Sequence, residues 1–359
     1  MTAFLVVLVI ILFGVAIWQM GKIFELSKTK EDNTSEVASD KDNNINGWLM
    51  LGFTIFTYAL LAICFWKWGN VVLPEAASEH GSEIDTLMFV SMALIFVVGF
   101  FTLWLLGYFS FKFRGEKGKQ ATFFADNDKL EFIWTIIPVI VLAGLIIYGL
   151  FTWTDIMNVE EDEDTLIVEL YAYQFDWRAR YAGDDNTLGE ANVRLIEGVN
   201  QLGVDASDPN AQDDVVVNEL HLPVGRKVLF KMRSQDVLHS AYMPHFRAQM
   251  NCVPGMVTQF AFTPITTTED MRLNDELAAK VKRINNIRRE NSQALVAKGE
   301  DPLEPYTFDY MLLCNKICGN NHYNMQMKIV VETEEEFNAW MAEQAKLGDV
   351  LNPKEIAKN

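Results

Sequence analysis

Four long apolar runs in the first 153 residues constrain the fold of this chain more than any other feature. Each run has about 19 or more residues without a charge, which is enough to cross a hydrocarbon core ~30 Å thick. They predict a transmembrane region, residues 1–154, with helices over residues 2–20, 48–66, 86–108 and 132–153. The first run lacks the basic start and the cleavage site of a signal peptide. A buried core helix is the alternative for that run.

Lysine and arginine are unevenly distributed between these runs. The connections 21–46 and 112–129 carry four and five of them, whereas residues 67–85 carry one lysine and four acids. Positive-inside bias places the two basic connections in the cytoplasm. Both termini then face outward, and the C-terminal domain is extracytoplasmic.

The chain as a whole is strongly acidic, with a formal net charge of −18. Nucleic acid is excluded as a partner because its phosphates require a basic face. A basic partner suits the chain better. Four cysteines are too few for a disulfide scaffold.

Residues 155–347 change in character to short β-branched and aromatic runs bounded by Gly, Pro, Asp and Asn. Such runs predict an antiparallel sandwich or barrel. The expected strands are Thr165–Tyr173, Val215–Leu222, Lys227–Arg233, Val257–Thr263, Phe308–Cys314 and Met325–Glu332. Two insertions interrupt them: residues 183–214 are typical of a surface loop, and residues 269–298 have a basic, helical composition.

The end of the chain predicts one more helix. Thr333 and Glu336 have the spacing of a capping box at the start of an amphipathic helix within residues 333–347. Residues 348–359 form a C-terminal tail.

One stretch, CNKICGNNHYNM at residues 314–325, holds two of the four cysteines in a C-x-x-x-C-x-x-x-H-x-x-M pattern. Cys314, Cys318, His322 and Met325 are all soft or borderline metal ligands. The pattern lies between two expected strands, where a rigid scaffold fixes ligand geometry. His239, in SQDVLHS, also follows a strand. In a sandwich, the two strand ends can meet at one rim.

Several interpretations compete for this set of ligands. Zinc accepts Cys and His but has no use for a thioether. A single blue copper leaves one cysteine surplus, and a disulfide between Cys314 and Cys318 leaves the other side chains without a purpose. Two copper ions bridged by both thiolates use every ligand.

Several stretches of the sequence resemble subunit II of cytochrome c oxidase. The resemblance rests on DVLHS, CNKICGNNHYNM, LEFIWTIIP and YQFDW, and it spans about residues 86–345 apart from the insertions. It implies a cupredoxin-like domain with a binuclear copper centre bridged by both cysteines. The implied ligands are Cys314, Cys318, His239, Met325, His322 and the backbone carbonyl of Lys316. His239 and Met325 complete one ion, and His322 and the carbonyl complete the other.

The function that the resemblance implies is that of the electron-accepting subunit of a respiratory oxidase. Electrons arrive from cytochrome c, a similar haem donor or another respiratory complex, and pass to haem in subunit I, where oxygen is reduced. The implied surroundings are subunit I, other oxidase subunits and the lipid of a bacterial inner membrane. The alternatives are a quinol oxidase subunit, which would lack the cysteines, and a membrane-anchored copper-delivery or single-copper electron-transfer protein.

Two positions depart from the family near the copper motif. Lys316 stands where a glutamate usually holds magnesium shared with subunit I, and Asn251 replaces a usual aspartate. The carbonyl ligand survives the change, but an ammonium does not bind a metal ion. Magnesium at that interface is therefore doubtful, and our hypothesis is that the Lys316 ammonium takes its place.

The resemblance also suggests where electrons and protons enter. Phe175 of YQFDW replaces a tryptophan thought to receive electrons, so the electrons enter at Phe175, Trp177 or Tyr173, unless these aromatics only pack strands. Asp236 matches an acid that docks the donor. Glu131 corresponds to the mouth of a proton channel in subunit I, although a glutamate in the first helical turn, after Asp128 as N-cap, is also favoured by the helix dipole.

Overall fold

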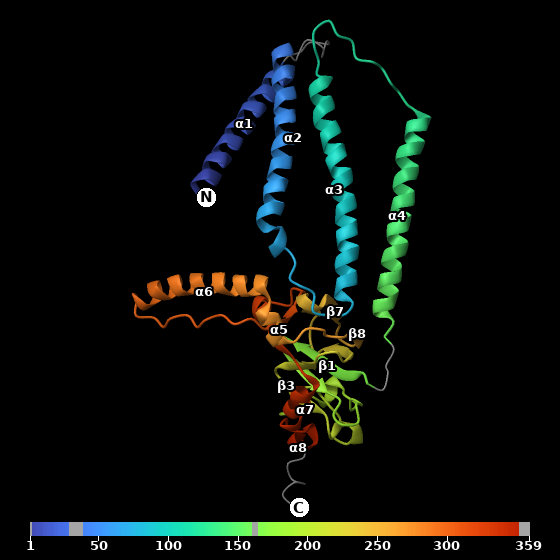
Figure 1. Cartoon of the computed structure of the whole chain (residues 1–359), viewed down its shortest axis with the longest axis vertical. Helices are drawn as coiled ribbons and strands as arrows, with labels where there is room; N and C mark the ends of the chain where they lie inside the picture. Colours follow the sequence, from blue (N-terminus) through green and yellow to red (C-terminus); the bar gives the residue numbers. More distant parts are fainter. Residues whose placement is uncertain (1, 29–38, 160–163, 352–359) are drawn as a thin grey trace, which may run out of the picture. The chain divides into compact units, whose positions relative to one another are not determined.

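The computed structural model describes residues 2–28, 39–159 and 164–351. By its internal contacts the chain divides into two compact units (Figure 1). The first consists of residues 1–72 and 92–134, and the second of residues 73–91 and 135–359.

Four long helices carry the apolar runs, as predicted. They are α1 Thr2–Lys28, α2 Asp40–Trp68, α3 Gly81–Lys112 and α4 Asp128–Met157. Each contains a stretch long and apolar enough to cross a membrane. They extend past the predicted ends because polar residues continue a helix beyond the hydrocarbon core. One prediction was wrong: Asn127 caps α4 rather than Asp128, since its Oδ1 accepts the Leu130 N–H at 3.0 Å.

Within the first unit, α2 contacts the later part of α3 closely. A Cβ at Gly107 would lie 2.2 Å from Thr54 Oγ1, so only glycine permits this approach. The rings of Trp48 and Phe111 lie 4.5 Å apart on the same interface. Small residues and aromatic pairs thus bring the two helices together, and the Tyr58 hydroxyl of α2 also donates to the Phe100 carbonyl of α3.

The second unit is built on two five-stranded sheets, ordered β3-β2-β1-β5-β8 and β4-β10-β9-β6-β7. The strands are β1 Leu166–Tyr173, β2 Asp176–Tyr181, β3 Val215–Val217, β4 Leu220–Pro223, β5 Val228–Ser234, β6 His239–Met243, β7 Ala248–Cys252, β8 Thr258–Phe262, β9 Tyr310–Cys314 and β10 Gln326–Glu332. The predicted sandwich is confirmed. It is not wholly antiparallel, because β1 pairs with β5, and β4 with β10, in parallel.

The inner faces of the sheets meet in one apolar core. Phe230, Leu222, Phe246 and Tyr310 are all buried there. The insertion at 269–298 is helical, as predicted, and forms α5 Thr268–Leu273 and α6 Asp275–Val296. The helix predicted within residues 333–347 is α7 Glu334–Ala342, and the capping box of Thr333 and Glu336 is present at its start. A short further helix, α8 Leu347–Leu351, follows it.

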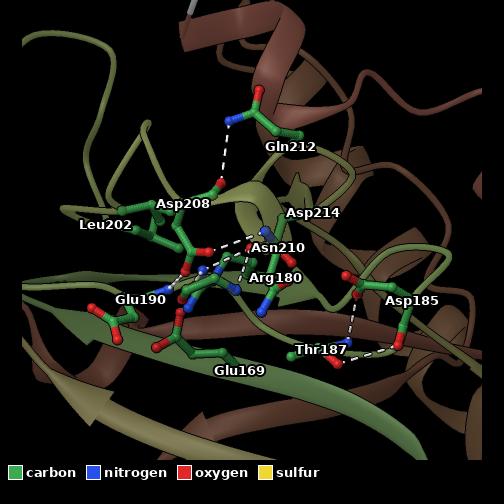
Figure 2. Close-up of polar contacts among 12 residues, drawn as sticks. Glu169, Arg180, Asp185, Thr187, Glu190, Leu202, Asp208, Asn210, Gln212 and Asp214 are labelled. Atoms are coloured by element: carbon green, nitrogen blue, oxygen red, sulfur yellow. Dashed lines mark hydrogen bonds and ion pairs between the residues drawn. The ribbon is translucent and has the colours of Figure 1, made fainter.

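The insertion at 183–214 is more than the surface loop we predicted. It contains two short 3₁₀ helices, η3 Val193–Leu195 and η4 Pro209–Ala211, and covers β1 with a small apolar cluster that includes Leu202 and Val204. Beneath it lies a buried group of charges (Figure 2): Arg180 contacts Glu169 at 2.7 Å and Asp214 at 2.8 Å. The loop therefore folds as part of the domain.

Candidate metal centre

Two adjacent strands bring the predicted ligands together. Cys314 ends β9 and His239 begins β6, and these strands pair antiparallel with Ala241 opposite Cys314. The Cys314 Sγ lies 3.7 Å from His239 Nδ1 as a result. The prediction that the two strand ends meet at one rim is therefore correct in geometry, although His239 opens a strand of its own that the sequence did not predict.

The remaining candidates lie on the loop between β9 and β10. Cys318 Sγ is 3.9 Å from Cys314 Sγ, so the two cysteines are not joined in a disulfide. The same sulfur lies 3.6 Å from His322 Nδ1 and 3.8 Å from Met325 Sδ. Cys314 Sγ lies 3.2 Å from the carbonyl oxygen of Lys316. The other four predicted donor groups thus each lie within 4 Å of one of the two sulfurs.

One side of this cluster is buried and the other reaches the surface. His239, Met325 and Cys318 are almost inaccessible, whereas Cys314 and His322 are half-buried. Burial and the neighbouring Cys314 thiol raise the pKa of Cys318 to about 11. A metal that binds here must displace thiol protons, and the set of two thiols, two imidazoles and one thioether suits a soft ion such as copper.

Asp236 orients the buried imidazole. Its Oδ1 lies 2.8 Å from His239 Nε2, and its carboxylate also accepts the N–H groups of Gln174 and Val237, each at 2.7 Å. Burial acts to raise the pKa of Asp236, but these hydrogen bonds hold it below its usual value. A carboxylate next to Nε2 favours the tautomer with the proton on that nitrogen, which leaves the unprotonated Nδ1 of His239 facing the sulfurs. Asp236 is still 30% exposed, so it also reaches the surface.

The predicted aromatic residues of YQFDW have different environments. Phe175 is half-buried, and a Cβ on Gly319, in the copper motif, would lie 2.7 Å from its ring. Trp177 is fully buried, with its ring centroid 6.3 Å from that of His239. Its ring is therefore not accessible from the surface of the domain. Phe175 is the member of this pair that reaches the surface beside the cluster.

Three neighbours of the cluster were missed by sequence reasoning. Gln174 donates from its side chain to the Cys318 carbonyl, which ties β1 to the metal loop. Ile317 is 90% exposed and Tyr323 is 84% exposed, although each lies between two predicted ligands. Exposed apolar side chains grouped at a site are typical of contact surfaces. The signal for them was their position inside the motif, which we interpreted only for its ligands.

The other predicted residues lie outside the cluster. Lys316 is exposed and makes no ion pair with any residue that the structure describes. Asn251, the second departure from the family pattern, is exposed on β7 opposite Ser240. Glu131 is exposed in the first turn of α4, where the helix dipole favours an acid.

Comparisons with known proteins agree with this geometry. Residues 66–151 match the family model of the cytochrome C oxidase subunit II transmembrane domain, and residues 167–270 match that of its periplasmic domain. The alternative cytochrome c oxidase subunit 2 of Bradyrhizobium diazoefficiens is 34% identical over 281 residues, which is 78% of this chain and 84% of that protein. The chain belongs to the cytochrome c oxidase subunit II family.

The chain is also similar to more distant proteins. Cytochrome c oxidase subunit 2 of Cereibacter sphaeroides is 22% identical over 293 residues, covering 78% of this chain and 82% of its own. The match to the crystal structure of the periplasmic domain of subunit II (CoxB) of Bradyrhizobium japonicum covers 51% of this chain and 94% of that chain, at 18% identity and with a TM-score of 0.30.

Membership of the family fixes the general role of the chain. It is the electron-accepting subunit of a haem–copper oxidase, and the oxidoreductase is the complex that it forms with other subunits. The four apolar helices place it in a membrane, with the C-terminal domain outside the cytoplasm.

Proposed function

We propose that the cluster holds two copper ions bridged by Cys314 and Cys318. His239 and Met325 would complete the coordination of one ion, and His322 and the Lys316 carbonyl that of the other. When bound, the copper pair supplies a one-electron acceptor and donor. The observation that carries the proposal is the pair of unbonded sulfurs 3.9 Å apart, with one imidazole beside each.

The protein's own residues keep the ligands in place. Asp236 holds the His239 ring, and Gln174 holds the Cys318 carbonyl. The strands β6 and β9 fix the two ends of the site within a packed sheet. A rigid frame of this kind limits the rearrangement of ligands when an electron arrives or leaves.

Copper loading of the full chain in detergent tests this function. We expect two copper ions per chain, a purple colour and a spin-resonance signal shared between both ions. One copper per chain would indicate a single-copper protein, and copper readily lost to a chelator would indicate a delivery protein. Either result contradicts the proposal.

Metal analysis of the assembled oxidase should also find no stoichiometric magnesium at the subunit I interface if the Lys316 ammonium takes its place.

We infer that Phe175 forms the surface through which a donor delivers electrons, with Asp236 beside it. A cytochrome c or similar basic haem protein is the donor that the acidic chain suits.

Replacing Phe175 with Leu should slow donor-driven reduction about tenfold while copper content is unchanged, because an aromatic contact is lost. Stopped-flow reduction of the oxidase measures this. Phe123→Leu, at an 89% exposed residue between α3 and α4, is the control. Equal rates in both variants would exclude Phe175.

We further propose that the chain resides in the inner membrane of a bacterium. Glu131 would lie there at the mouth of a proton channel in subunit I. The proposal rests on its place at the start of α4, beside the lysine-rich connection 112–129. In the assembled oxidase, Glu131→Gln should slow proton uptake from the cytoplasmic side without slowing copper reduction. Unchanged uptake would contradict this role.

A further inference from the structure

Helix α6 is an arm that reaches out from the sheets (Figure 1). None of its 22 residues is buried, and a helix of this length is ~33 Å long. One face is covered by the returning segment: Asn285 exchanges two hydrogen bonds with the Tyr306 backbone, at 3.0 and 2.7 Å, and Ser292 Oγ accepts the Leu303 N–H at 2.9 Å. Near its root, Val281 packs against the domain core.

The arm carries a dense positive charge in an otherwise acidic chain. Within residues 280–289 there are five lysines and arginines and no acid, although the whole chain has a net charge of −18. These residues are Lys280, Lys282, Arg283, Arg288 and Arg289. None of the five is in an ion pair within the part of the chain that the structure describes. The charge is therefore available to a partner.

The face opposite the returning segment combines cations with an apolar side chain. Lys280, Arg283 and Ile287 follow at spacings of three and four residues, which places them on one side of the helix. All three are exposed, and Ile287 is 55% exposed. We name these three residues the open face. A basic helix with apolar residues among its cations is typical of helices that lie on a membrane surface.

The root of the arm is fixed to the segment that leads into a membrane helix. Asn274 caps α6 by accepting the Glu276 N–H at 3.0 Å, and its side-chain amide donates to Glu75. Glu75 lies just before α3, and its neighbour Ala77 donates its N–H to the His245 carbonyl at 2.7 Å. The arm therefore starts at the end of the domain from which the chain enters the membrane. Leu273, at this root, is 79% exposed.

We propose that the open face of α6 binds anionic phospholipid headgroups at the outer surface of the membrane that α3 and α4 cross. Its charge is complementary to lipid phosphate, and its root lies where the chain meets the membrane. An acidic protein is the other partner that such a charge could attract. The position of the root favours lipid, because Asn274 at the root donates to Glu75, in the segment that leads into the membrane helix α3. Binding of this kind weakens as salt screens the charges.

Lysine footprinting tests the proposal on the full chain in nanodiscs of phosphatidylcholine alone or mixed with phosphatidylglycerol. We expect Lys280 and Lys282 to be acetylated at least about threefold more slowly in the anionic discs, and the difference to vanish at ~1 M salt. Lys346, which is paired with Asp184 at 2.6 Å, serves as the internal reference. The footprint requires no copper, so its failure would leave the proposed metal centre untouched.

Two matched variants separate lipid binding from other causes. Arg283→Glu reverses a charge on the open face and should remove most of the protection of Lys280. Arg194→Glu makes the same change at an exposed residue of η3 and should leave the protection intact. Equal acetylation in both lipids would overturn the proposal. Protection that appears only when partner subunits are present would also overturn it, because that result assigns the arm to a protein surface.

Discussion

Replacing Cys318 with Ser is expected to destroy the copper pair and to slow donor-driven electron transfer by roughly a hundredfold or more. Cys318 Sγ is the atom on which the site converges, since it lies within 4 Å of another cysteine, a histidine and a methionine. A serine side chain is shorter than a cysteine side chain, and its oxygen is a harder ligand that does not bridge two soft ions. Copper analysis should find one ion or none per chain, and the shared spin-resonance signal should be absent.

The control for this variant is a cysteine that the site does not use. Cys64→Ser makes the same chemical change within α2 and should keep both ions and the signal. If Cys318→Ser retained two copper ions with a shared signal, the bridging role of this sulfur would be wrong. The whole interpretation of the motif would then be wrong with it.

The candidate ligands could be predicted because most of them lie close together in sequence. Four of the six predicted donors belong to one loop, where chain connectivity alone keeps them near one another. His239 was reachable from the expectation that strand ends meet at a rim. The roles of Asp236 and Gln174 were not: Asp236 contacts His239, three residues along the chain, but also accepts the N–H of Gln174, 62 residues away, and Gln174 reaches a carbonyl 144 residues away. Only tertiary structure shows such hydrogen bonds.

Strands β6 and β7 were not predicted from the sequence, for a similar reason. The β7 sequence AQMNC has a polar residue on each side of its central methionine and no β-branched residue, so propensity gives little signal. It is a strand because β6 pairs with it over five residues, from His239 opposite Cys252 to Met243 opposite Ala248. The four apolar helices, by contrast, were predictable because membrane crossing depends on composition and length alone.

The burial of Arg180 could not be predicted from the sequence. An arginine is usually exposed, but Arg180 is 2% accessible because the 183–214 insertion folds over β1 and β2 (Figure 2). It is shared by Glu169 and Asp214, which are also buried. Burial raises the pKa of Asp214 to about 6 even though Arg180 opposes the shift, whereas Arg180 and Arg233 outweigh burial and hold the pKa of Glu169 below its usual value.

Replacing Arg180 with Met is therefore expected to lower the free energy of unfolding by about 3–5 kcal/mol, because Asp214 loses its buried ion-pair partner and Glu169 keeps only Arg233. In a domain of this size the melting temperature should fall by roughly 6–20 °C. The loss should be larger at pH 7 than at pH 4. Glu169 has a lowered pKa in the folded protein, so the stability that it contributes is present above its unfolded pKa and fades as pH falls. Asp214 has a raised pKa, so the stability that it contributes is present at low pH and is lost as pH rises through about 6.

Thermal unfolding of the full chain in detergent, followed by near-ultraviolet circular dichroism at both pH values, measures the effect of the Arg180 substitution. Arg194→Met makes the same change at an exposed residue and should alter the free energy by less than about 0.5 kcal/mol. Equal melting temperatures for the two variants would mean that the charges beneath the insertion do not stabilise the fold. A loss at pH 4 as large as that at pH 7 would mean that the carboxylates are not its cause, since protonation removes the unpaired charge on which the prediction depends.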